Sequence, residues 1–367
     1  MRTTIPTNGN GSITVSDRID PILTQSPKVD NTSANNENYF CCTHPLCARH
    51  KKLCDQQSPE VPQITTIYQK CTGDKDTTGL LVPEVLCDER ARSGTGGEDT
   101  RVCCIPPKTD RLISHPNAAK LAKIPCGTIG LMVKIQDGTY AQRGEFPWMV
   151  YLVYKYKRTC SGTLIHPSYV LTAHHCVQPG LEKVRLGEYN LEEKSQCSPG
   201  EAAGEACSHV QEIAISQKFR NHAHDVGLLR LAQPASLDGD LVRPICLPLY
   251  LNLRLHVPLT VSITGWGLTE KGKPSNILMK AETQVVTKEK GCTNDYVICV
   301  GGHNNSNHCN GDSGGPYQAQ GTFGGFNRFV QYGIISDGSR YCATPDRPSR
   351  AVLVAYVMEW ILSKMVL

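Results

Sequence analysis

The sequence predicts an all-β domain in its carboxy-terminal two thirds, preceded by a small module held together by disulfides. From Ile135 onward, short apolar runs alternate with turns rich in Gly, Pro and Asn, a pattern typical of a sandwich or barrel. The runs occupy residues 148–154, 161–165, 170–173, 226–231 and 331–335. The 18 cysteines are scattered rather than set in paired zinc-binding knuckles, so we interpret them as disulfides.

Length, charge and cysteine content narrow the classes of protein that fit. A chain of 367 residues suits one full-sized domain plus a small module. The 38 basic and 34 acidic residues are spread along the chain and leave a net charge of +4, so we expect no nucleic-acid partner. Disulfides persist in oxidising compartments, and we therefore expect a secreted, extracellular protein.

The two ends of the chain bear on secretion and on membranes. Residues 1–20 are polar and lack the apolar stretch of a signal peptide, so we expect that the true start is missing or was trimmed. The apolar tail at residues 351–367 contains Glu359 and Lys364 and is shorter than the roughly 20 apolar residues of a membrane-spanning helix. We expect a terminal helix docked on the domain, and no membrane partner.

The amino-terminal third divides into three segments. Residues 1–40 are rich in Asn, Ser, Thr and Asp and predict a mobile tail. Residues 41–104 hold eight cysteines and form a module too small to be stable by apolar burial alone, so disulfides must hold it together. Residues 105–134 form a linker with a single anchor, Cys126, and the all-β domain occupies residues 135–367.

Three segments supply the chemistry of a serine nucleophile. Ser313 stands in Cys309-Asn310-Gly311-Asp312-Ser313-Gly314-Gly315-Pro316, and a serine hydroxyl needs a neighbouring base to become a nucleophile. The glycines allow the backbone N–H groups of Gly311 and Ser313 to converge as an oxyanion hole. Upstream, His174 and His175 offer a base, and Asp225 offers a carboxylate just before an apolar run. Alone, the serine segment would be no more than a glycine-rich turn.

These segments, with four others in the same order, carry a family resemblance. The chain order His, Asp, Ser and the spacing resemble the trypsin-like serine proteases over the whole of residues 135–367. The other segments are Gly144-Glu145-Phe146-Pro147-Trp148, Cys160-Ser161-Gly162, Pro244-Ile245-Cys246-Leu247-Pro248 and Gly265-Trp266-Gly267. The resemblance implies two antiparallel Greek-key β-barrels with a C-terminal helix, and an active site in the cleft between the barrels.

The same resemblance assigns roles to the residues of the site. Ser313 would be the nucleophile, His175 the general base and then the general acid, and Asp225 the group that orients the imidazole. The family places its catalytic histidine immediately before the cysteine, so His174 is given a surface or packing role. Ser336 matches the serine that supports the triad carboxylate.

Activation by cleavage is also implied by the resemblance. The mature amino terminus of the family falls at Ile135, so the activating cut would follow Lys134. The freed α-ammonium would pair with Asp312 and drive the substrate pocket and oxyanion hole into order, because a buried charge without a partner is costly. Gln136 replaces the usual valine after the new terminus and needs hydrogen bonds of its own, so we expect less efficient activation.

Five disulfides of the protease part follow from likeness to the family. Three are family bridges, one is a local loop staple, and one keeps the amino-terminal part attached after cleavage. In that order they are Cys160–Cys176, Cys292–Cys299 and Cys309–Cys342, then Cys197–Cys207, then Cys126–Cys246.

The first module resembles the clip domain of arthropod protease-cascade zymogens. The resemblance is carried by the doublet Cys103-Cys104 after Cys42, Cys47, Cys54 and Cys87. Cys41 and Cys71 exceed the usual six cysteines, and we expect them to form an extra pair. Eight cysteines allow many pairings, so the connectivity stays open. We expect the module to dock an upstream protease, a cofactor or a substrate zymogen; the alternative is an inert tether.

The substrate pocket departs from the trypsin-like pattern. Asn307 stands six residues before the nucleophile, where trypsin-like members have an aspartate, and an amide does not neutralise a guanidinium. Strong preference for basic residues is therefore not expected. His308 and Ser349 narrow the pocket and make it more polar, and Gly338 matches an edge of the substrate cleft.

No metal or cofactor is expected. His222 and His224 stand near Asp225, but solvated histidines are favoured over a zinc site shared with His175. Glu188 matches a calcium-loop position, and one glutamate is weak evidence for a hard cation. Asn10, Asn31 and Asn304 begin glycan acceptor triplets and are candidate attachment sites in a secreted protein.

The leading hypothesis is a secreted serine endopeptidase zymogen in an extracellular arthropod cascade, in innate immunity such as melanisation or Toll-type signalling. Its partners would be protein substrates, an upstream activating protease and serpin inhibitors. The alternative is a weakly active or inactive clip-domain homologue that acts as a regulatory cofactor. The intact triad favours the enzyme and disfavours a purely structural disulfide protein, whereas the altered pocket keeps the cofactor alternative open.

Overall fold

The computed structural model describes most of the chain from Tyr68 to Leu367. The described residues are 68–72, 77–83, 86–87, 92–93, 101–105, 110–129, 140–193, 210–269, 272–286, 292, 294–301, 308–337 and 348–367. The expected tail at residues 1–40 and the cysteines 41, 42, 47 and 54 lie outside these ranges.

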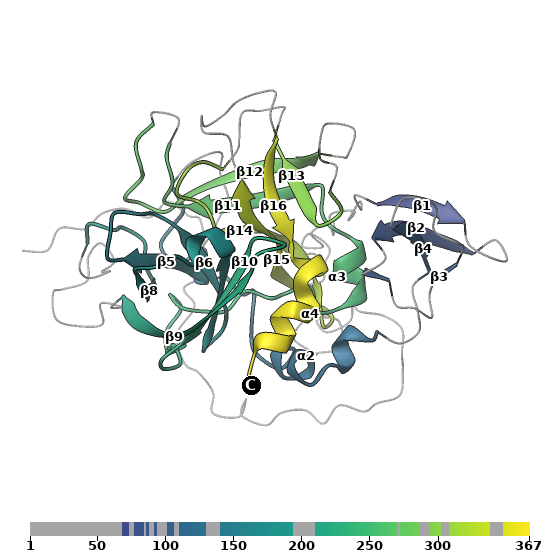
Figure 1. Ribbon diagram of the computed structural model, residues 1–367, viewed down its shortest axis with the longest axis horizontal. Coiled ribbons are helices and arrows are strands. Elements are labelled where there is room, and N and C mark those ends of the chain that lie inside the picture. Colours follow the sequence, from purple (N-terminus) through teal and green to yellow (C-terminus); the bar gives the residue numbers. More distant parts are fainter. Residues whose placement is uncertain are drawn as a thin grey trace, which may run out of the picture. The chain divides into compact units, whose positions relative to one another are not determined.

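Six antiparallel strands close into a first barrel. Their order around the barrel is β10-β7-β6-β5-β8-β9. Figure 1 shows this barrel in teal. The strands are β5 (Met149–Tyr154), β6 (Ser161–His166), β7 (Tyr169–Ala173), β8 (Leu181–Leu186), β9 (Gln211–Asn221) and β10 (Val226–Leu231). Every residue of β7 is buried, because one face lies on the core of the first barrel and β15 of the second barrel packs against the strand as well.

A second closed barrel follows in the sequence. Its order is β11-β12-β13-β16-β15-β14, so each barrel places sequence-distant strands side by side. The strands are β11 (Thr260–Gly265), β12 (Met279–Val286), β13 (Val297–Val300), β14 (Pro316–Phe323), β15 (Phe326–Asp337) and β16 (Ser349–Leu353). All five apolar runs singled out in the sequence lie in or directly before these strands, and the prediction of two antiparallel barrels is confirmed.

Buried polar groups link the two barrels. The indole N–H of Trp148, directly before β5, donates a hydrogen bond to the amide oxygen of Gln318 in β14, 2.5 Å away. The Gln318 amide in turn donates to the Thr264 hydroxyl of β11 at 3.3 Å. The Trp148 ring is fully buried and packs on Phe329, with 5.5 Å between centroids. These contacts fix the two barrels against each other across the shared core.

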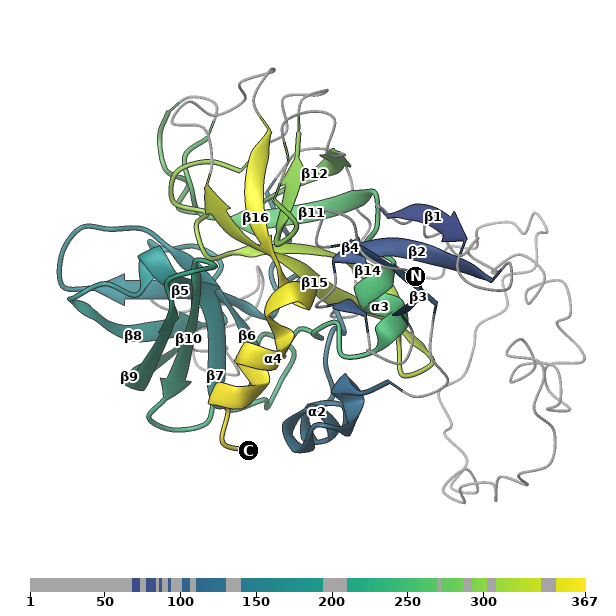
Figure 2. The ribbon, with the colours of Figure 1, turned by 45° about the vertical axis from the view of Figure 1, so that its right-hand side comes forward.

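The chain ends in the helix α4 (Val354–Lys364), which follows β16 directly and lies against β10, β15 and β16 (Figure 2). Its buried side chains recur at helical spacing: Val354, Val357, Met358, Ile361 and Leu362. The expected docked terminal helix is confirmed. Among the described helices, none is long and apolar enough to cross a membrane.

A separate four-stranded sheet of order β1-β2-β4-β3 precedes the barrels. Its strands are β1 (Gln69–Thr72), β2 (Thr78–Pro83), β3 (Arg92–Ser93) and β4 (Arg101–Cys104). Two disulfides, Cys71–Cys103 and Cys87–Cys104, brace this small sheet, as expected for a module with little apolar core.

The expected pair Cys41–Cys71 is wrong, because Cys71 is bonded to Cys103. In β1, Cys71 faces Gly79 of β2, and β4 lies on the other side of β2. The Cys103 sulfur is 3.0 Å from where a Cβ on Gly79 would stand. The bridge therefore crosses over a residue without a side chain, which brings two strands that are not direct neighbours within bonding reach.

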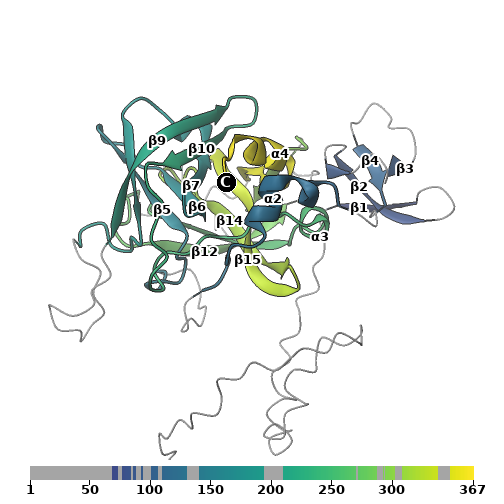
Figure 3. The same ribbon diagram turned by 90° about the horizontal axis from the view of Figure 1, so that it is seen from below.

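The segment expected as a linker is folded where the structure describes it. It contains the short 3-10 helix η6 (Leu112–Ser114) and the helix α2 (Pro116–Leu121), which lies beside α4 (Figure 3). The Asn117 amide donates hydrogen bonds to the carbonyl oxygens of Leu362 and Met365, at 3.0 and 2.8 Å. The expected bridge Cys126–Cys246 is present. The linker is thus anchored by side chains as well as by its disulfide.

Candidate active site

The predicted site residues come from both barrels. His175 lies in the 3-10 helix η7 (His174–Cys176) directly after β7, and Asp225 directly precedes β10. Ser313 lies in the loop before β14 of the second barrel. Its carbonyl oxygen accepts a hydrogen bond from the backbone N–H of Ser161, at 2.8 Å, in β6 of the first barrel. The loop that carries the serine is therefore attached to the barrel that carries the histidine and the aspartate.

His175 and Asp225 are joined by two hydrogen bonds. The imidazole Nδ1 lies 2.9 Å from Asp225 Oδ2, and the backbone N–H of His175 donates to Asp225 Oδ1, also at 2.9 Å. The Ser336 hydroxyl, at the end of β15, donates to Asp225 Oδ2. When Nδ1 carries the proton that is donated to Asp225, the lone pair of Nε2 is left to accept another.

Asp225 is held in an unusual backbone conformation. Its φ is +51°, and within the described residues it is the one non-glycine residue at positive φ. This left-handed region is sparsely populated by residues with a side chain and is strained. The backbone N–H of His174 donates to the Asp225 carbonyl at 3.0 Å, which helps to hold this conformation. Sequence reasoning did not find this feature.

The charge on Asp225 is stabilised by its partners. Burial raises the pKa of the carboxyl, but the hydrogen bonds from His175 and Ser336 outweigh burial, and the pKa lies below its ordinary value. The carboxylate is therefore ionised at neutral pH and fixes the orientation of the imidazole. It would also stabilise an imidazolium if His175 took up a proton.

Two backbone N–H groups beside Ser313 are available to a ligand. The backbone N–H of Leu268 donates a hydrogen bond to the Asn310 carbonyl oxygen at 2.8 Å. In a trans peptide the carbonyl and the following N–H point in opposite directions, so the N–H of Gly311 points away from Leu268. Gly311 has φ +106°, a conformation that favours glycine. Within the described chain, neither Gly311 nor Ser313 donates its backbone N–H. Such a pair can receive a developing oxyanion.

Asp312 is turned into the protein. Its carboxylate accepts backbone hydrogen bonds from Gly267 at 2.8 Å and from Cys309 at 2.9 Å. Burial raises the pKa of the carboxyl to about 6, and the two hydrogen bonds only partly offset that rise. No cation among the described residues forms an ion pair with it, so this carboxylate would gain much from a positively charged partner.

His308 is buried and bonded on both sides of its ring. Nδ1 lies 2.7 Å from the hydroxyl of Tyr317 in β14, and Nε2 lies 3.1 Å from the Asp337 carbonyl at the end of β15. Burial lowers the pKa of His308 to about 4, so the ring is neutral at pH 7. Ser349 is fully buried in β16, and its hydroxyl has no partner in the described structure. The neighbouring Asn307 and Gly338 lie outside the described residues.

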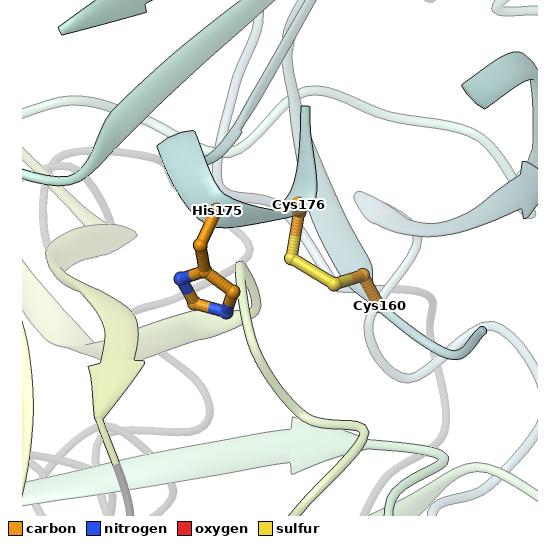
Figure 4. Close-up of side chains that lie close together, drawn as sticks. All are labelled: Cys160, His175 and Cys176. Atoms are coloured by element: carbon orange, nitrogen blue, oxygen red, sulfur yellow. A yellow bond between two sulfur atoms is a disulfide. The ribbon is translucent and has the colours of Figure 1, made fainter. Parts of the chain in front are cut away.

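The ligand atoms of Cys160, His175 and Cys176 lie within 4.8 Å of one another (Figure 4). The two sulfurs are joined to each other in the expected bridge Cys160–Cys176, so they are not free thiolates that could bind a metal. Glu188, considered for calcium, is buried and forms an ion pair with Arg185, 2.7 Å away.

The other histidines near the triad pack against aromatic rings. His174 packs against His222 in a tilted arrangement, with 4.1 Å between ring centroids, which agrees with a packing role for His174. His224 lies against Tyr296 and Tyr356, at 5.0 and 5.3 Å. His222 is exposed, and His224 is half-buried beside these two rings, so the expectation of solvated histidines fits His222 better than His224.

The remaining predicted positions are partly outside the described ranges. Cys292–Cys299 is present, and Cys309 is disulfide-bonded to a residue that the structure does not describe. Lys134, Ile135, Cys342 and the loop with Cys197 and Cys207 also lie outside the described residues.

Comparison with known proteins agrees with this geometry. The family model described as Trypsin matches residues 135–361. The CLIP domain-containing serine protease HP8 of Bombyx mori is 33% identical over 301 residues, which cover 72% of this chain and 80% of the relative. Serine protease ea of Drosophila melanogaster is 29% identical over 377 aligned residues, covering 90% of this chain and 92% of the relative.

A solved structure is also similar. The crystal structure of the Drosophila Grass clip serine protease of the Toll pathway superimposes with a TM-score of 0.62 at 25% sequence identity. The match covers 81% of this chain and 98% of that one, so it extends beyond the two barrels.

Proposed function

The chain belongs to the trypsin family and is a serine endopeptidase, and from this premise we propose that it is a secreted clip-domain zymogen activated by cleavage after Lys134. The single observation that supports this best is the hydrogen-bonded set His175, Asp225 and Ser336 beside two available amides at Gly311 and Ser313. The proposed domains are a tail (1–40), a clip domain (41–104), a linker (105–134) and the protease domain (135–367).

In the proposed mechanism, Ser313 Oγ attacks the carbonyl carbon of the scissile peptide while Nε2 of His175 takes the hydroxyl proton. The carbonyl oxygen becomes an oxyanion and accepts hydrogen bonds from the N–H groups of Gly311 and Ser313. The imidazolium, stabilised by Asp225, then gives its proton to the leaving nitrogen as the C–N bond breaks. A water molecule attacks the resulting acyl ester by the same steps and frees Ser313.

Activation is proposed to act through Asp312. Cleavage after Lys134 would create an α-ammonium at Ile135, which would pair with the Asp312 carboxylate. That carboxylate has a raised pKa and no described cationic partner, so the pair would stabilise its charged form. Asp312 directly precedes the nucleophile, and the new ion pair would therefore fix the loop that carries Ser313 and the oxyanion donors.

The names of relatives support a role in a proteolytic cascade. A Drosophila relative, 31% identical over 266 residues, is named Spaetzle-processing enzyme, and a Spodoptera litura relative, 29% identical over 317 residues, is named Phenoloxidase-activating enzyme 1. By analogy, this chain would act on protein substrates after activation by another protease, in an extracellular immune cascade, under control by serpin inhibitors.

One observation favours a second candidate function, a regulatory homologue that cleaves little. His308 is next to the proposed pocket residue Asn307, and its ring is locked between Tyr317 and Asp337. A locked aromatic ring beside the pocket leaves less room for a long substrate side chain. In this role the chain would bind cascade partners through its clip domain.

The decisive experiment cuts the purified zymogen after Lys134, verifies Ile135 as the new terminus, and adds a fluorophosphonate probe. Stoichiometric labelling that disappears in the Ser313→Ala protein is the expected result. A clean cut without labelling would overturn the enzyme mechanism for this chain and favour the regulatory homologue.

A further inference from the structure

The loop between β5 and β6 carries a cluster of positive charge at the surface. Its residues Lys155, Tyr156, Lys157 and Arg158, called the basic loop below, are all exposed. The Tyr156 side chain is 76% exposed, an unusual position for a large aromatic group. Tyr and Arg side chains are enriched among the residues that contribute most to protein interfaces.

The basic loop is attached to the catalytic machinery. The Arg158 guanidinium donates a hydrogen bond to the carbonyl oxygen of His175, 2.8 Å away. The next residue, Thr159, has its methyl group 3.4 Å from where a Cβ on Gly311 would stand. Cys160 then forms the disulfide to Cys176. A ligand on this loop would therefore lie beside the reacting groups.

Much of the positive charge of the loop is not neutralised within the protein. Lys155 pairs with Glu182 at 3.3 Å, an exposed contact of small energetic value. Among the described residues, no carboxylate forms an ion pair with Lys157 or Arg158. The Arg158 guanidinium donates one N–H to the His175 carbonyl oxygen. A guanidinium has five N–H donors, so further donors remain for a carboxylate.

The loop is held in place before any ligand arrives. The Arg158 guanidinium lies over the Tyr154 ring, 5.9 Å from its centroid. The Lys155 backbone N–H donates to the Gly180 carbonyl at 2.8 Å, and the Tyr156 ring packs against the same glycine. Because these contacts already restrict the loop, a ligand that binds it pays less conformational entropy.

The position of the loop indicates which half of a substrate it would meet. The end of β15 contacts the nucleophile loop at Gly314, whose N–H donates to the Ile335 carbonyl oxygen at 2.8 Å. The basic loop lies elsewhere: it is next to Gly311 of the nucleophile loop and is bonded to the His175 carbonyl oxygen. In the proposed mechanism, His175 gives its proton to the leaving nitrogen, so the chain beyond that nitrogen departs on the side of His175.

We propose that the basic loop binds an acidic segment of the protein substrate, on the carboxy-terminal side of the scissile bond. The proposal rests on the protease function proposed above and adds a substrate class to it. Opposite charge would raise the rate of encounter and help to select among cascade proteins.

The test uses the cut enzyme and two internally quenched peptides that share the same sequence up to the scissile bond. That shared sequence is chosen beforehand by screening a peptide library for cleavage. The peptides differ only in the second and third residues after the scissile bond, Asp-Asp or Asn-Asn. We expect kcat/KM to be about 10-fold higher for the acidic peptide at about 10 mM salt, and the two values to converge at about 1 M salt.

The readout is the ratio of the two kcat/KM values within each protein, which cancels any change in basal activity. The ratio should fall to about 1 in the double variant Lys157→Ala, Arg158→Ala. The matched control Arg111→Ala, Lys123→Ala removes the same amount of positive charge from two exposed positions outside the basic loop. This control should keep the wild-type ratio of the two kcat/KM values. Equal rates for both peptides in the wild type, or an equal loss in the control, would overturn the proposal.

A binding arm separates this proposal from the protease function. Fluorescence anisotropy measures the affinity of each labelled peptide for the cut Ser313→Ala protein, which needs no catalysis. Tighter binding of the Asp-Asp peptide, lost in the loop double variant, supports the basic loop even if no peptide is cleaved. Equal affinities for the two peptides would contradict it even if the wild-type protein is an efficient protease.

Discussion

The carboxylate of Asp312 accepts a hydrogen bond from the backbone N–H of Gly267, 2.8 Å away, and this contact holds a carboxyl group inside the protein. Burial raises its pKa to about 6 from 3.8. Between these two values the folded, uncut chain keeps the proton that the unfolded chain has lost. The contribution of Asp312 to stability therefore decreases as pH rises from about 4 to about 6.

Replacing Asp312 by asparagine should remove this dependence in the uncut chain. The free energy of unfolding of Asp312→Asn, relative to wild type, should rise by on the order of 2 kcal/mol between pH 4 and pH 6.5. Urea denaturation at the two pH values measures the change. The comparison between the two proteins cancels groups they share, such as His308, whose lowered pKa acts with the opposite sign.

Cleavage after Lys134 should change the same measurement. If the new α-ammonium pairs with Asp312, the pKa of the carboxyl falls, and the loss of stability on raising the pH disappears from the cut chain. A cut chain whose stability still declines through this pH range as in the uncut chain would contradict the proposed ion pair.

Ser336→Ala should slow acylation of Ser313. The substitution removes one of the hydrogen bonds that hold Asp225 and lower its pKa, so the imidazole of His175 is oriented less well. A lost hydrogen bond to a charged group corresponds to about 10-fold in the rate of fluorophosphonate labelling. Ser336→Thr keeps the hydroxyl and should retain most of the rate; equal labelling by the alanine variant would argue against a role for Ser336.

Local sequence patterns predicted an all-β sandwich or barrel and the order of the catalytic segments, and the family resemblance carried by those segments then specified two barrels. Strands such as β7 and β10 show as short apolar runs between turns, and the segments around His175 and Ser313 are contiguous motifs. The pairing of Cys71 with Cys103 was not predictable in this way, because it depends on Gly79 letting a bridge cross an intervening strand.

Side-chain environments were also beyond local reasoning. The sequence marks His224 only as a histidine before Asp225, whereas its partners Tyr296 and Tyr356 come from distant segments. The positive φ of Asp225 likewise follows from the hydrogen bonds around it, and aspartate carries no signal for it beyond a modest tolerance of that region.

Tyr317→Phe should destabilise the protein through His308. The Tyr317 hydroxyl donates to Nδ1, and the second ring nitrogen then donates its proton to the Asp337 carbonyl. Removing the hydroxyl leaves a buried acceptor without a donor, which costs about 1–3 kcal/mol in the free energy of unfolding. Nitrogen NMR of the wild type should show a neutral ring protonated at Nε2 at pH 7. A charged ring, or the other tautomer, would contradict this arrangement.

Arg101→Ala should loosen the disulfide-braced sheet. Arg101 of β4 pairs with Asp295, with 3.2 Å between Nε and Oδ1, and both side chains are mostly buried at 18% and 14% exposure. The pair lines a cavity of about 160 Å³ together with apolar side chains such as Leu81 and Val285. Truncating Arg101 removes this partner of a mostly buried carboxylate, which costs more than the ion pair itself contributes, so we expect a clear loss of local stability.

Hydrogen exchange measures the local opening of β2 and β4 directly. We expect amide exchange in these strands to rise by about 10-fold in either single variant, Arg101→Ala or Asp295→Ala, while β7 in the barrel core stays protected. The double variant should exchange no faster than the singles, because each single already removes the shared interaction. Strictly additive effects would instead mean that the two side chains act independently, which would contradict a stabilising ion pair between them.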